Sequence, residues 1–475
     1  MIKKKVLPPA QVPAVSAALF KAYDIRGAVQ TALTEEAVSA IGLALGAMAR
    51  AQGIGTMVVG RDGRLSGPAL SAALMAGLCA AGVDVIDIGM VPTPLVYFAT
   101  VLTGCGSGVA VTGSHNPPEY NGLKMMLAGR TLHGEEIQAI AEALSDPARY
   151  QTLFAGELGK VRSLDVVPDY LARVSGDVKL ARPLKVVVDA GNGVAGAVAP
   201  ALLRALGIVE LTQLYCEVDG TFPNHHPDPA HPENLQDLMR VVREKDADIG
   251  LAFDGDGDRL GVVTRGGQMI YPDRQLMLYA ADVLEDHPGA TIIYDVKCTR
   301  NMAPWIRSRG GDPQMWCTGH SLIKARMKEL GAKLAGEMSG HIFFNDRWYG
   351  FDDGLYTAAR LLEILSRVAD PGALLEALPD ACSTPELQIP LTEGENVRLI
   401  NALKAQGHFS GASEVITLDG LRVEYPDGFG LVRASNTTPV LVLRFEADDA
   451  QALARIQQAI RAALLAVRPD LSIPF

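Results

Sequence analysis

Hydrophobic and polar residues alternate along the first 160 residues in segments that predict helices and strands in turn. Alanine-rich segments with helical spacing predict helices over 34–50 and 66–81. Short apolar runs predict strands over 56–60, 83–88 and 108–112. Helices that alternate with strands are typical of a mostly parallel sheet with crossover helices.

The same alternation continues in two further segments of the chain. A polar stretch over 155–163 marks the first boundary, and the second segment opens with a strand over 185–188 and closes near 265–267. The third segment contains the pattern of a strand over 291–296 and of helices over 273–284, 321–330 and 353–368.

The last 95 residues have a different pattern, with short strands, tight turns and one closing helix. The expected elements are strands over 415–418, 421–425, 430–434 and 440–445, and a helix over 448–467. We therefore predict three related α/β domains with mixed, mostly parallel sheets and a C-terminal α+β domain, placed around a central cleft. The predicted domains are 1–162, 163–267, 268–380 and 381–475. In each α/β domain a short apolar segment runs into a glycine-bearing polar loop, and these loops begin at Thr112, Asp254 and Gly336.

Charge and composition limit the possible partners. The chain has 43 Lys and Arg against 54 Asp and Glu, so its net charge of −11 disfavours nucleic acid and anionic membranes. An anionic substrate would need a local basic cluster. Six scattered cysteines without a C-x-x-C pair indicate reduced thiols. With no long apolar run, and with prolines at 8, 9 and 13 that interrupt any signal-peptide core, we expect a cytoplasmic protein.

Three aspartates provide the strongest chemical signal. Asp254, Asp256 and Asp258 alternate with glycines directly after the apolar run 249–253. Carboxylates so close together repel one another unless a cation neutralises them, and Mg²⁺ suits an all-oxygen site that keeps positions open for phosphate. A calcium EF-hand would need Gly and Glu where Arg259 and Arg265 stand. The alternative is a solvated acidic turn.

A second motif places Ser114 on the loop Thr112–Pro118, which follows the strand near 108–112. Glycine and proline around this serine favour an exposed nucleophile, although the pattern is not that of the hydrolase elbow. His115 is adjacent in sequence, and we expect its side chain to point away from Ser114. Lys124 adds a cation that could hold a phosphate or move a proton. The alternatives are a simple turn and a solvated lysine.

Two further loops carry polar groups suited to a sugar phosphate. In Gly336–His341 an acceptor, a hydroxyl and an imidazole lie between glycines, which suits sugar hydroxyls; Lys297 and the loop Thr318–His320 belong to the same domain. In Arg433–Pro439 one guanidinium and several hydroxyls and amides form a candidate phosphate clamp. Taken alone, the loop Gly336–His341 could be a helix cap, and the segment Arg433–Pro439 could be a polar hairpin turn.

Together these motifs resemble the α-D-phosphohexomutase superfamily, and most closely its bacterial phosphomannomutase/phosphoglucomutase group. The resemblance rests on Tyr23–Gly27, the Ser114 loop, Asp254–Arg259, Glu337–His341 and Arg433–Thr438, which occur in the family's order. It implies that Ser114 carries the phosphoryl group and that one Mg²⁺ is held by Asp254, Asp256 and Asp258 together with Ser114. It further implies that Arg26, His115, Lys124, Arg259 and His341 surround the transfer site.

The resemblance also implies the substrate contacts and the reaction. Glu337 and Ser339 would bind the O3 and O4 hydroxyls of the sugar. The non-reacting phosphate would be bound by Arg433, Ser435, Asn436, Thr437 and Thr438, with Tyr23, Lys297 and His320. The reaction would convert hexose 1-phosphate and hexose 6-phosphate reversibly, with glucose 1,6-bisphosphate or an equivalent as intermediate and activator, in a monomeric enzyme.

Several points stay open at this level. The proton acceptor could be Lys124 or His341, and glucose and mannose fit equally well. Gly113 stands where the family usually has alanine, and we expect it to loosen the loop slightly. Phosphoglucosamine mutase is a rival, but that group has Gln where this chain has Met338. A magnesium-dependent sugar phosphatase would not need the distal clamp, and a non-catalytic sensor would not need Ser114 or the aspartates.

Overall fold

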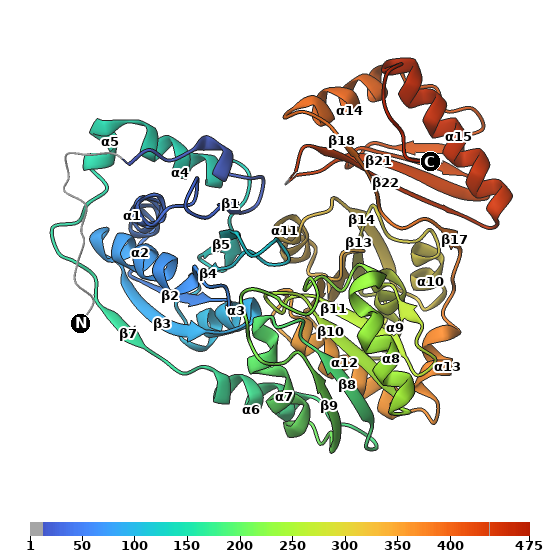
Figure 1. The fold of residues 1–475 in the computed structure, drawn as a ribbon, viewed down its shortest axis with the longest axis horizontal. Helices are drawn as coiled ribbons and strands as arrows, with labels where there is room; N and C mark the ends of the chain where they lie inside the picture. The colour runs from blue at the N-terminus through green and yellow to red at the C-terminus, as the bar shows by residue number, and fades with distance from the viewer. Residues whose placement is uncertain (1–12, 437) are drawn as a thin grey trace. The chain divides into compact units, whose positions relative to one another are not determined.

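A computed structural model describes residues 13–436 and 438–475 of the chain. It contains two compact units (Figure 1). The first consists of the described residues of Met1–Pro272 together with Ser339–Glu376, and the second of Asp273–Met338 together with Ala377–Phe475. No helix among the described residues is long and apolar enough to span a bilayer.

The first sheet of the first unit has the strand order β1-β5-β4-β2-β3-β7, with β6 paired to β5. Strands β4, β2 and β3 are parallel, as the sequence predicts, and β7, in the stretch predicted to be a boundary, is parallel to them. Strand β5 runs antiparallel to both of its neighbours, β1 and β4. Helices α1 and α2 cover one face of the sheet and enclose a large apolar core with it (Figure 1). The elements are β1 (Ile25–Ala28), α1 (Glu35–Ala51), β2 (Thr56–Arg61), α2 (Gly67–Ala80), β3 (Asp84–Met90), α3 (Thr93–Leu102), β4 (Gly108–Val111), β5 (Tyr120–Leu127), β6 (Arg130–Thr131), α4 (Glu135–Ser145), α5 (Pro147–Gln151) and β7 (Val161–Ser163), preceded by a short 3-10 turn at Ala17–Leu19.

A second sheet in this unit has the order β12-β11-β10-β8-β9, in which β10, β8 and β9 are parallel. Strands β10 and β11 form an antiparallel hairpin with Phe253 opposite Leu260. The turn of this hairpin is therefore the segment that contains the three aspartates. The elements are α6 (Val167–Asp177), β8 (Lys185–Asp189), α7 (Ala199–Ala205), β9 (Glu210–Leu214), α8 (Gln236–Glu244), β10 (Ile249–Phe253), β11 (Leu260–Thr264), β12 (Met269–Ile270), β16 (Ile342–Phe344), α12 (Gly354–Ser366) and α13 (Pro371–Glu376), with 3-10 turns at Val194–Ala197 and Pro232–Leu235.

The second unit combines parallel strands with an antiparallel sheet. Strand β13 pairs in parallel with β14 and β15. The C-terminal residues form a six-stranded sheet in the order β17-β22-β21-β20-β19, with β18 beside β22, and helices α14 and α15 cover one of its faces (Figure 1). The elements are α9 (Pro272–Asp286), β13 (Thr291–Asp295), α10 (Met302–Ser308), β14 (Asp312–Trp316), α11 (His320–Leu330), β15 (Leu334–Gly336), β17 (Cys382–Ser383), β18 (Leu387–Pro390), α14 (Glu395–Gln406), β19 (Glu414–Ile416), β20 (Leu421–Tyr425), β21 (Gly428–Ala434), β22 (Val440–Ala447) and α15 (Ala450–Val467).

The predicted fold class, three α/β domains and an α+β domain, is confirmed. Predicted helices begin where the sequence offers a cap: the Oγ1 atom of Thr34 accepts a hydrogen bond from the N–H of Ala37 at 3.2 Å at the start of α1. Sequence reasoning missed α3, because Pro92 and Pro94 and several β-branched residues hide its helical character. Helix α3 is nevertheless important, since it contacts the aspartate loop.

Candidate active site

The aspartate loop is a tight turn whose two glycines have different functions. Gly257 has a φ of +76°, which favours glycine. At Gly255 a β-carbon would lie 2.3 Å from the carbonyl oxygen of Ser114, so this glycine allows the serine loop to approach the aspartate loop. Asp254, Asp256 and Asp258 are all completely buried.

One carboxylate oxygen of each aspartate already has a hydrogen-bond or ion-pair partner in the protein. Oδ1 of Asp254 accepts hydrogen bonds from the backbone N–H groups of Asp258 (3.1 Å) and Arg259 (3.2 Å). Oδ2 of Asp256 and Oδ2 of Asp258 lie 2.8 and 2.5 Å from Nζ of Lys124. Oδ2 of Asp256 also accepts a hydrogen bond from the hydroxyl of Thr93, at the start of α3, at 2.6 Å.

The remaining oxygens fit a divalent metal. One oxygen from each aspartate lies within 4.8 Å of the others. Oδ1 of Asp256 and Oδ1 of Asp258 are buried and accept no hydrogen bond from any residue that the structure describes. Burial and the charges of Asp256 and Asp258 raise the pKa of Asp254 well above its ordinary value. A hard cation would relieve this repulsion, so the donor set is suited to Mg²⁺.

Lys124 is not a solvated lysine. Its side chain is almost completely buried between Asp256 and Asp258. Burial alone lowers the pKa of Lys124, but the two carboxylates outweigh burial and raise this pKa well above its usual value. Lys124 therefore keeps its proton and its positive charge.

The serine loop positions its nucleophile beside both a carboxylate and an imidazole. Oγ of Ser114 lies 3.2 Å from Oδ2 of Asp254 and 3.1 Å from Nδ1 of His115. Burial, then the charges of Arg259 and Arg26, lower the pKa of His115 well below its ordinary value, so the ring is neutral.

The expectation that His115 points away from Ser114 is therefore wrong. It assumed that consecutive side chains point to opposite sides, as they do in extended chain. Ser114 instead has a φ of +50°, in the left-handed region, and this turn brings the two neighbouring side chains to the same side.

Arg64, which no motif indicated, holds the shape of the serine loop. Its Nη1 donates to the carbonyl oxygens of Pro117 (2.6 Å) and Tyr120 (2.9 Å), and its Nη2 to those of Ser114 (2.8 Å) and Asn116 (2.5 Å). Its Nε donates to the carboxylate of Asp62 at 3.2 Å. Every donor group of this buried guanidinium is thus used, four times on backbone carbonyls of one loop.

Asp62 and Gly113 complete this support. Oδ2 of Asp62 accepts hydrogen bonds from the Thr112 hydroxyl (2.8 Å) and the N–H of Gly113 (3.2 Å). A β-carbon at position 113 would lie 2.5 Å from Cζ of Arg64. We expected Gly113 to loosen the loop slightly, but it does not. It makes room for the guanidinium that holds the loop.

Arg26 and Arg259 add two cations close to the serine loop and the aspartate loop. Arg26, on β1, donates from Nη1 to Oδ1 of Asn116 and from Nη2 to Asp24, both at 2.6 Å. The half-buried Tyr23 precedes this pair. Nε of Arg259 lies 3.8 Å from Oδ2 of Asp254, and Nη1 lies 4.0 Å from Asp228.

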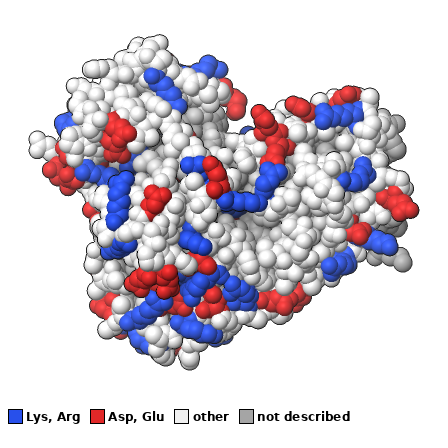
Figure 2. Space-filling model, turned by 180° about the vertical axis from the view of Figure 1, so that it is seen from behind, with Lys and Arg blue, Asp and Glu red and all other residues white. Residues whose placement is uncertain are grey.

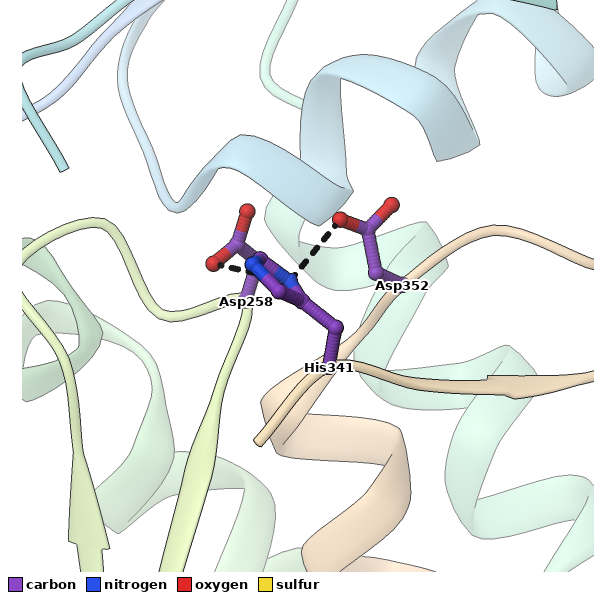
Figure 3. Close-up of side chains that lie close together, drawn as sticks. All are labelled: Asp258, His341 and Asp352. Atoms are coloured by element: carbon purple, nitrogen blue, oxygen red, sulfur yellow. Dashed lines mark ion pairs between the residues drawn. The ribbon is translucent and has the colours of Figure 1, made fainter. Parts of the chain in front are cut away.

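His341 links the aspartate loop to a carboxylate that sequence reasoning missed. Figure 3 shows its ring between Asp258 and Asp352. Nδ1 of His341 lies 3.1 Å from Oδ2 of Asp352 and 3.6 Å from Oδ1 of Asp258. Nε2 accepts a hydrogen bond from Nε of Arg259 at 3.1 Å. The half-buried Ser339 lies two residues before His341.

In the second unit, a single buried carboxylate connects the predicted sugar-binding loops at the carboxyl ends of parallel strands. Oδ2 of Asp295 accepts a hydrogen bond from the Thr318 hydroxyl at 2.8 Å, and Oδ1 accepts one from the N–H of Met338 at 3.3 Å. The N–H of Gly319 donates to Oε1 of Glu337. The buried His320 begins α11 directly after this loop. Asp295 was not in the predicted set.

The predicted phosphate clamp lies on the turn between β21 and β22. Nε of Arg433 donates to Oδ2 of Asp419 at 3.0 Å, and the same oxygen accepts from the N–H of Thr318 at 3.0 Å. Lys297 lies 3.2 Å from Glu386, and the charges of Glu386 and Asp295 raise its pKa although burial opposes them.

The turn that follows Arg433 is held by short-range hydrogen bonds. The hydroxyls of Ser435 and Thr438 lie 3.0 Å apart, and Asn436 is half-buried beside them. Thr437, which the family resemblance places in the clamp, lies outside the described residues.

The structure thus brings Ser114, His115, Lys124, Arg26, Arg259, His341 and the three aspartates together within the first unit. In the second unit the loop Thr318–His320 is hydrogen-bonded to Asp295, Glu337 and Asp419, and Asp419 also accepts from Arg433. Lys297 pairs with Glu386. These cations are local features of an acidic chain. Figure 2 shows Lys and Arg interleaved with Asp and Glu over the face drawn.

Comparisons with known proteins agree along nearly the whole chain. Models described as phosphoglucomutase/phosphomannomutase, alpha/beta/alpha domains I, II and III and C-terminal domain match residues 17–151, 168–267, 271–382 and 386–463. The chain is 57% identical over 447 residues to a phosphoglucomutase of Neisseria gonorrhoeae (94% of this chain, 96% of the relative).

Two further relatives cover almost all of both chains. A phosphomannomutase/phosphoglucomutase of Pseudomonas aeruginosa is 54% identical over 467 residues (98% and 99% of the two chains). A crystal structure of a phosphoglucomutase/phosphomannomutase family protein from Burkholderia thailandensis superposes with a TM-score of 0.92 at 60% identity, covering 97% of this chain and all of the other.

Proposed function

The chain belongs to the phosphoglucomutase/phosphomannomutase family, and we propose that it interconverts hexose 1-phosphate and hexose 6-phosphate through a phosphorylated Ser114. The observation that carries this proposal is the position of the Ser114 hydroxyl, 3.2 Å from Asp254 at the edge of a buried cluster of three carboxylates. Such a hydroxyl is suited to carry a phosphoryl group beside a divalent ion.

The residues around Ser114 have distinct functions in this proposal. Asp254, Asp256 and Asp258, with Ser114, would hold Mg²⁺, which supplies positive charge that neutralises the transferring phosphoryl oxygens. The charged Lys124 and Arg259 donate hydrogen bonds to those oxygens. The neutral His115 presents Nδ1 to the Ser114 hydroxyl at 3.1 Å. It can therefore take the hydroxyl proton when Ser114 is phosphorylated, and return it to the Ser114 oxygen when the phosphoryl group passes to the sugar. Because Lys124 keeps its proton, it serves as a donor, and His341, the other predicted candidate, takes the proton from the attacking sugar hydroxyl.

The substrate contacts follow the family motifs. Glu337 and Ser339 bind sugar hydroxyls. The phosphate that does not react is bound by Tyr23, Lys297, His320, Arg433, Ser435, Asn436, Thr437 and Thr438. The sugar bisphosphate formed by the first transfer turns round and returns its other phosphate to Ser114, so glucose 1,6-bisphosphate acts as intermediate and activator.

We also propose a monomer in the cytoplasm. The six cysteines, all free in the structure, fit a reducing compartment. Glucose and mannose phosphates are both included as substrates, since they differ at a hydroxyl outside the predicted O3 and O4 contacts.

The test combines mass spectrometry with turnover. We expect one phosphate on the peptide that contains Ser114 after incubation with glucose 1,6-bisphosphate, and mutase activity on glucose 1-phosphate or mannose 1-phosphate. Ser114→Ala should lose both, whereas Ser145→Ala, an exposed serine on α4, should keep both. Full activity of Ser114→Ala would refute the proposal that Ser114 carries the phosphoryl group.

The same assay separates the rival functions. Stoichiometric release of inorganic phosphate would indicate a phosphatase instead. Preference for glucosamine 1-phosphate would indicate the phosphoglucosamine branch.

A further inference from the structure

Thr93, the first residue of α3, contacts the aspartate loop through both its backbone and its side chain. Its N–H donates to the carbonyl oxygen of Asp256 at 2.9 Å, and its hydroxyl donates to Oδ2 of the same residue at 2.6 Å. Both residues are buried. Because the backbone bond already fixes the position of the loop, the hydroxyl acts on the orientation of the carboxylate itself.

Oδ2 of Asp256 has no lone pair left for a metal ion. A carboxylate oxygen has about two lone-pair positions. The hydroxyl of Thr93 occupies one of them, and Nζ of Lys124, at 2.8 Å, occupies the other. Oδ1 accepts no hydrogen bond within the part of the chain that the structure describes. Asp256 can therefore offer one oxygen, Oδ1, to a cation.

The same count holds for Asp254, where the backbone replaces the hydroxyl. Its Oδ1 accepts hydrogen bonds from the N–H groups of Asp258 at 3.1 Å and Arg259 at 3.2 Å, so both lone pairs of Oδ1 are used. Its Oδ2 is the oxygen that lies 3.2 Å from the Ser114 hydroxyl. Asp254 is thus limited to one ligand oxygen by the loop itself, and Asp256 by a residue outside the loop.

The number of oxygens that a carboxylate offers distinguishes the two common hard cations. Mg²⁺ requires a nearly ideal octahedron of oxygens at about 2.0–2.1 Å, into which a bidentate carboxylate fits badly. Ca²⁺ takes roughly six to eight oxygens at about 2.3–2.6 Å and accepts bidentate carboxylates. Ligation through single oxygens therefore favours the smaller ion.

We propose that Thr93 is a positioning residue that makes the site selective for Mg²⁺ over Ca²⁺, because its hydroxyl leaves Asp256 with one ligand oxygen. This inference rests on the proposed function, in which the three aspartates hold Mg²⁺. It adds the source of the selectivity, which comes from α3 and not from the aspartate motif. Without the hydroxyl, Oδ2 regains a lone pair, and both oxygens of Asp256 become available to a larger ion.

Thr93→Val tests the hydroxyl alone, because valine keeps the shape of the side chain and the backbone bond to Asp256. Lys124 still pairs with the carboxylate in this variant. Calorimetric titration of the full-length protein with MgCl₂ and, separately, with CaCl₂ gives both dissociation constants without turnover. All samples are brought to the same phosphorylation state, which mass spectrometry verifies.

We expect the unaltered protein to bind Mg²⁺ more tightly than Ca²⁺. In Thr93→Val the dissociation constant for Mg²⁺ should rise about 10-fold, as for other residues that hold a metal ligand in place. The dissociation constant for Ca²⁺ should stay within about threefold, because the second oxygen compensates for the looser carboxylate. Thr93→Ala, which also lacks the hydroxyl, should show the same change in the ratio and serves if the valine variant does not fold.

Two matched variants separate the hydroxyl from packing. Thr93→Ser keeps the hydroxyl and loses only a methyl group, so both dissociation constants should stay within about twofold of the unaltered values. Thr100→Val makes the same replacement at another buried position of α3. The Thr100 hydroxyl donates to the carbonyl oxygen of Tyr97 at 2.7 Å, so this variant should leave both dissociation constants unchanged.

Three results would overturn the proposal: equal affinity of the unaltered protein for both ions, an unchanged ratio of the two dissociation constants in Thr93→Val, or the same fall of this ratio in Thr100→Val. The last would show a general effect of packing in α3. If Ser114→Ala stays active while Thr93→Val loses selectivity, the proposed function fails and the role of Thr93 stands.

Discussion

The cluster around Ser114 and the clamp around Arg433 are both proposed to bind phosphate, but they are built differently. In the cluster, Asp254, Asp256 and Asp258 are completely buried and face Lys124 or backbone N–H groups. In the clamp, the cations Arg433 and Lys297 are buried, but their carboxylate partners reach solvent: the side chain of Glu386 is 38% exposed and that of Asp419 15%.

This difference matches the two tasks we propose. A group that stabilises charge in a transition state works best when it is fixed and dry before the reaction, because no reorganisation is then needed. A group that binds and releases the other phosphate needs a moderate affinity. Partly solvated carboxylates beside Lys297 and Arg433 weaken the hold on an anion and help to release it.

The supports of the two loops differ in the same way. The serine loop is held by Arg64, whose guanidinium donates to four of its carbonyls. The clamp turn is held by local bonds, such as that between the hydroxyls of Ser435 and Thr438. We therefore expect changes in the cluster to affect stability and kcat, and changes in the clamp to affect KM.

Lys124→Met should have the largest effect on stability. It leaves the buried carboxylates of Asp256 and Asp258 without their cation, which costs about 3–5 kcal/mol of unfolding free energy. Denaturant unfolding measures the loss, and added Mg²⁺ should recover part of it. Lys185→Met breaks an ion pair with Glu210 in which both side chains are well exposed, so it should cost less than about 1 kcal/mol. Equal losses would show that burial is not what distinguishes the cluster.

Arg433→Ala should weaken substrate binding by about 2–4 kcal/mol, because a charged contact to phosphate is lost. Steady-state kinetics should show this loss in KM, while the unfolding free energy changes little. Arg455→Ala, at a half-exposed arginine paired with Asp427 in the same module, provides the comparison and should leave KM unchanged. An unaltered KM in Arg433→Ala would contradict the proposal that Arg433 binds the phosphate that does not react.

Arg64→Lys tests the support of the serine loop while keeping its charge. Lysine cannot reach four carbonyls and Asp62 at once, so we expect a loss of about 1.5–3 kcal/mol in unfolding free energy and a lower kcat. Arg61→Lys, at a half-buried arginine on β2, should be nearly neutral. A stable Arg64→Lys protein with unchanged kcat would contradict the preorganisation of this loop.

Glu386→Gln should have the smallest effect, and its sign is informative. Removing the charge beside Lys297 should lower KM by a factor of up to about five, since a half-exposed ion pair is worth about 0.2–1 kcal/mol. A higher KM would indicate that Glu386 orients Lys297 instead of competing with phosphate. Glu395→Gln removes the charge from another partly exposed ion pair, with Arg468, and is the control for charge alone.

Much of the fold could be predicted because the relevant signals are local. Thr34 begins α1 and Asp449 caps α15 close to the predicted positions, since a cap depends on a few neighbouring residues. Helix α3 was missed because its prolines and β-branched residues resemble a loop or strand, and its burial by the surrounding chain overrides that preference. The domain boundaries at 162, 267 and 380 stay predictions.

The sequence by itself determined which chemistry the chain carries. Asp254, Asp256 and Asp258, the Ser114 loop and the Arg433 turn are contiguous motifs, and residues so close in sequence must lie close in space. Tertiary structure alone decided which residues hold them. Arg64, Asp295, Asp352 and Asp419 are single residues far from their partners along the chain, so no pattern marks them. The same holds for His115, because a left-handed turn at Ser114 depends on the carbonyl contacts of Arg64 and not on the identity of the two neighbours.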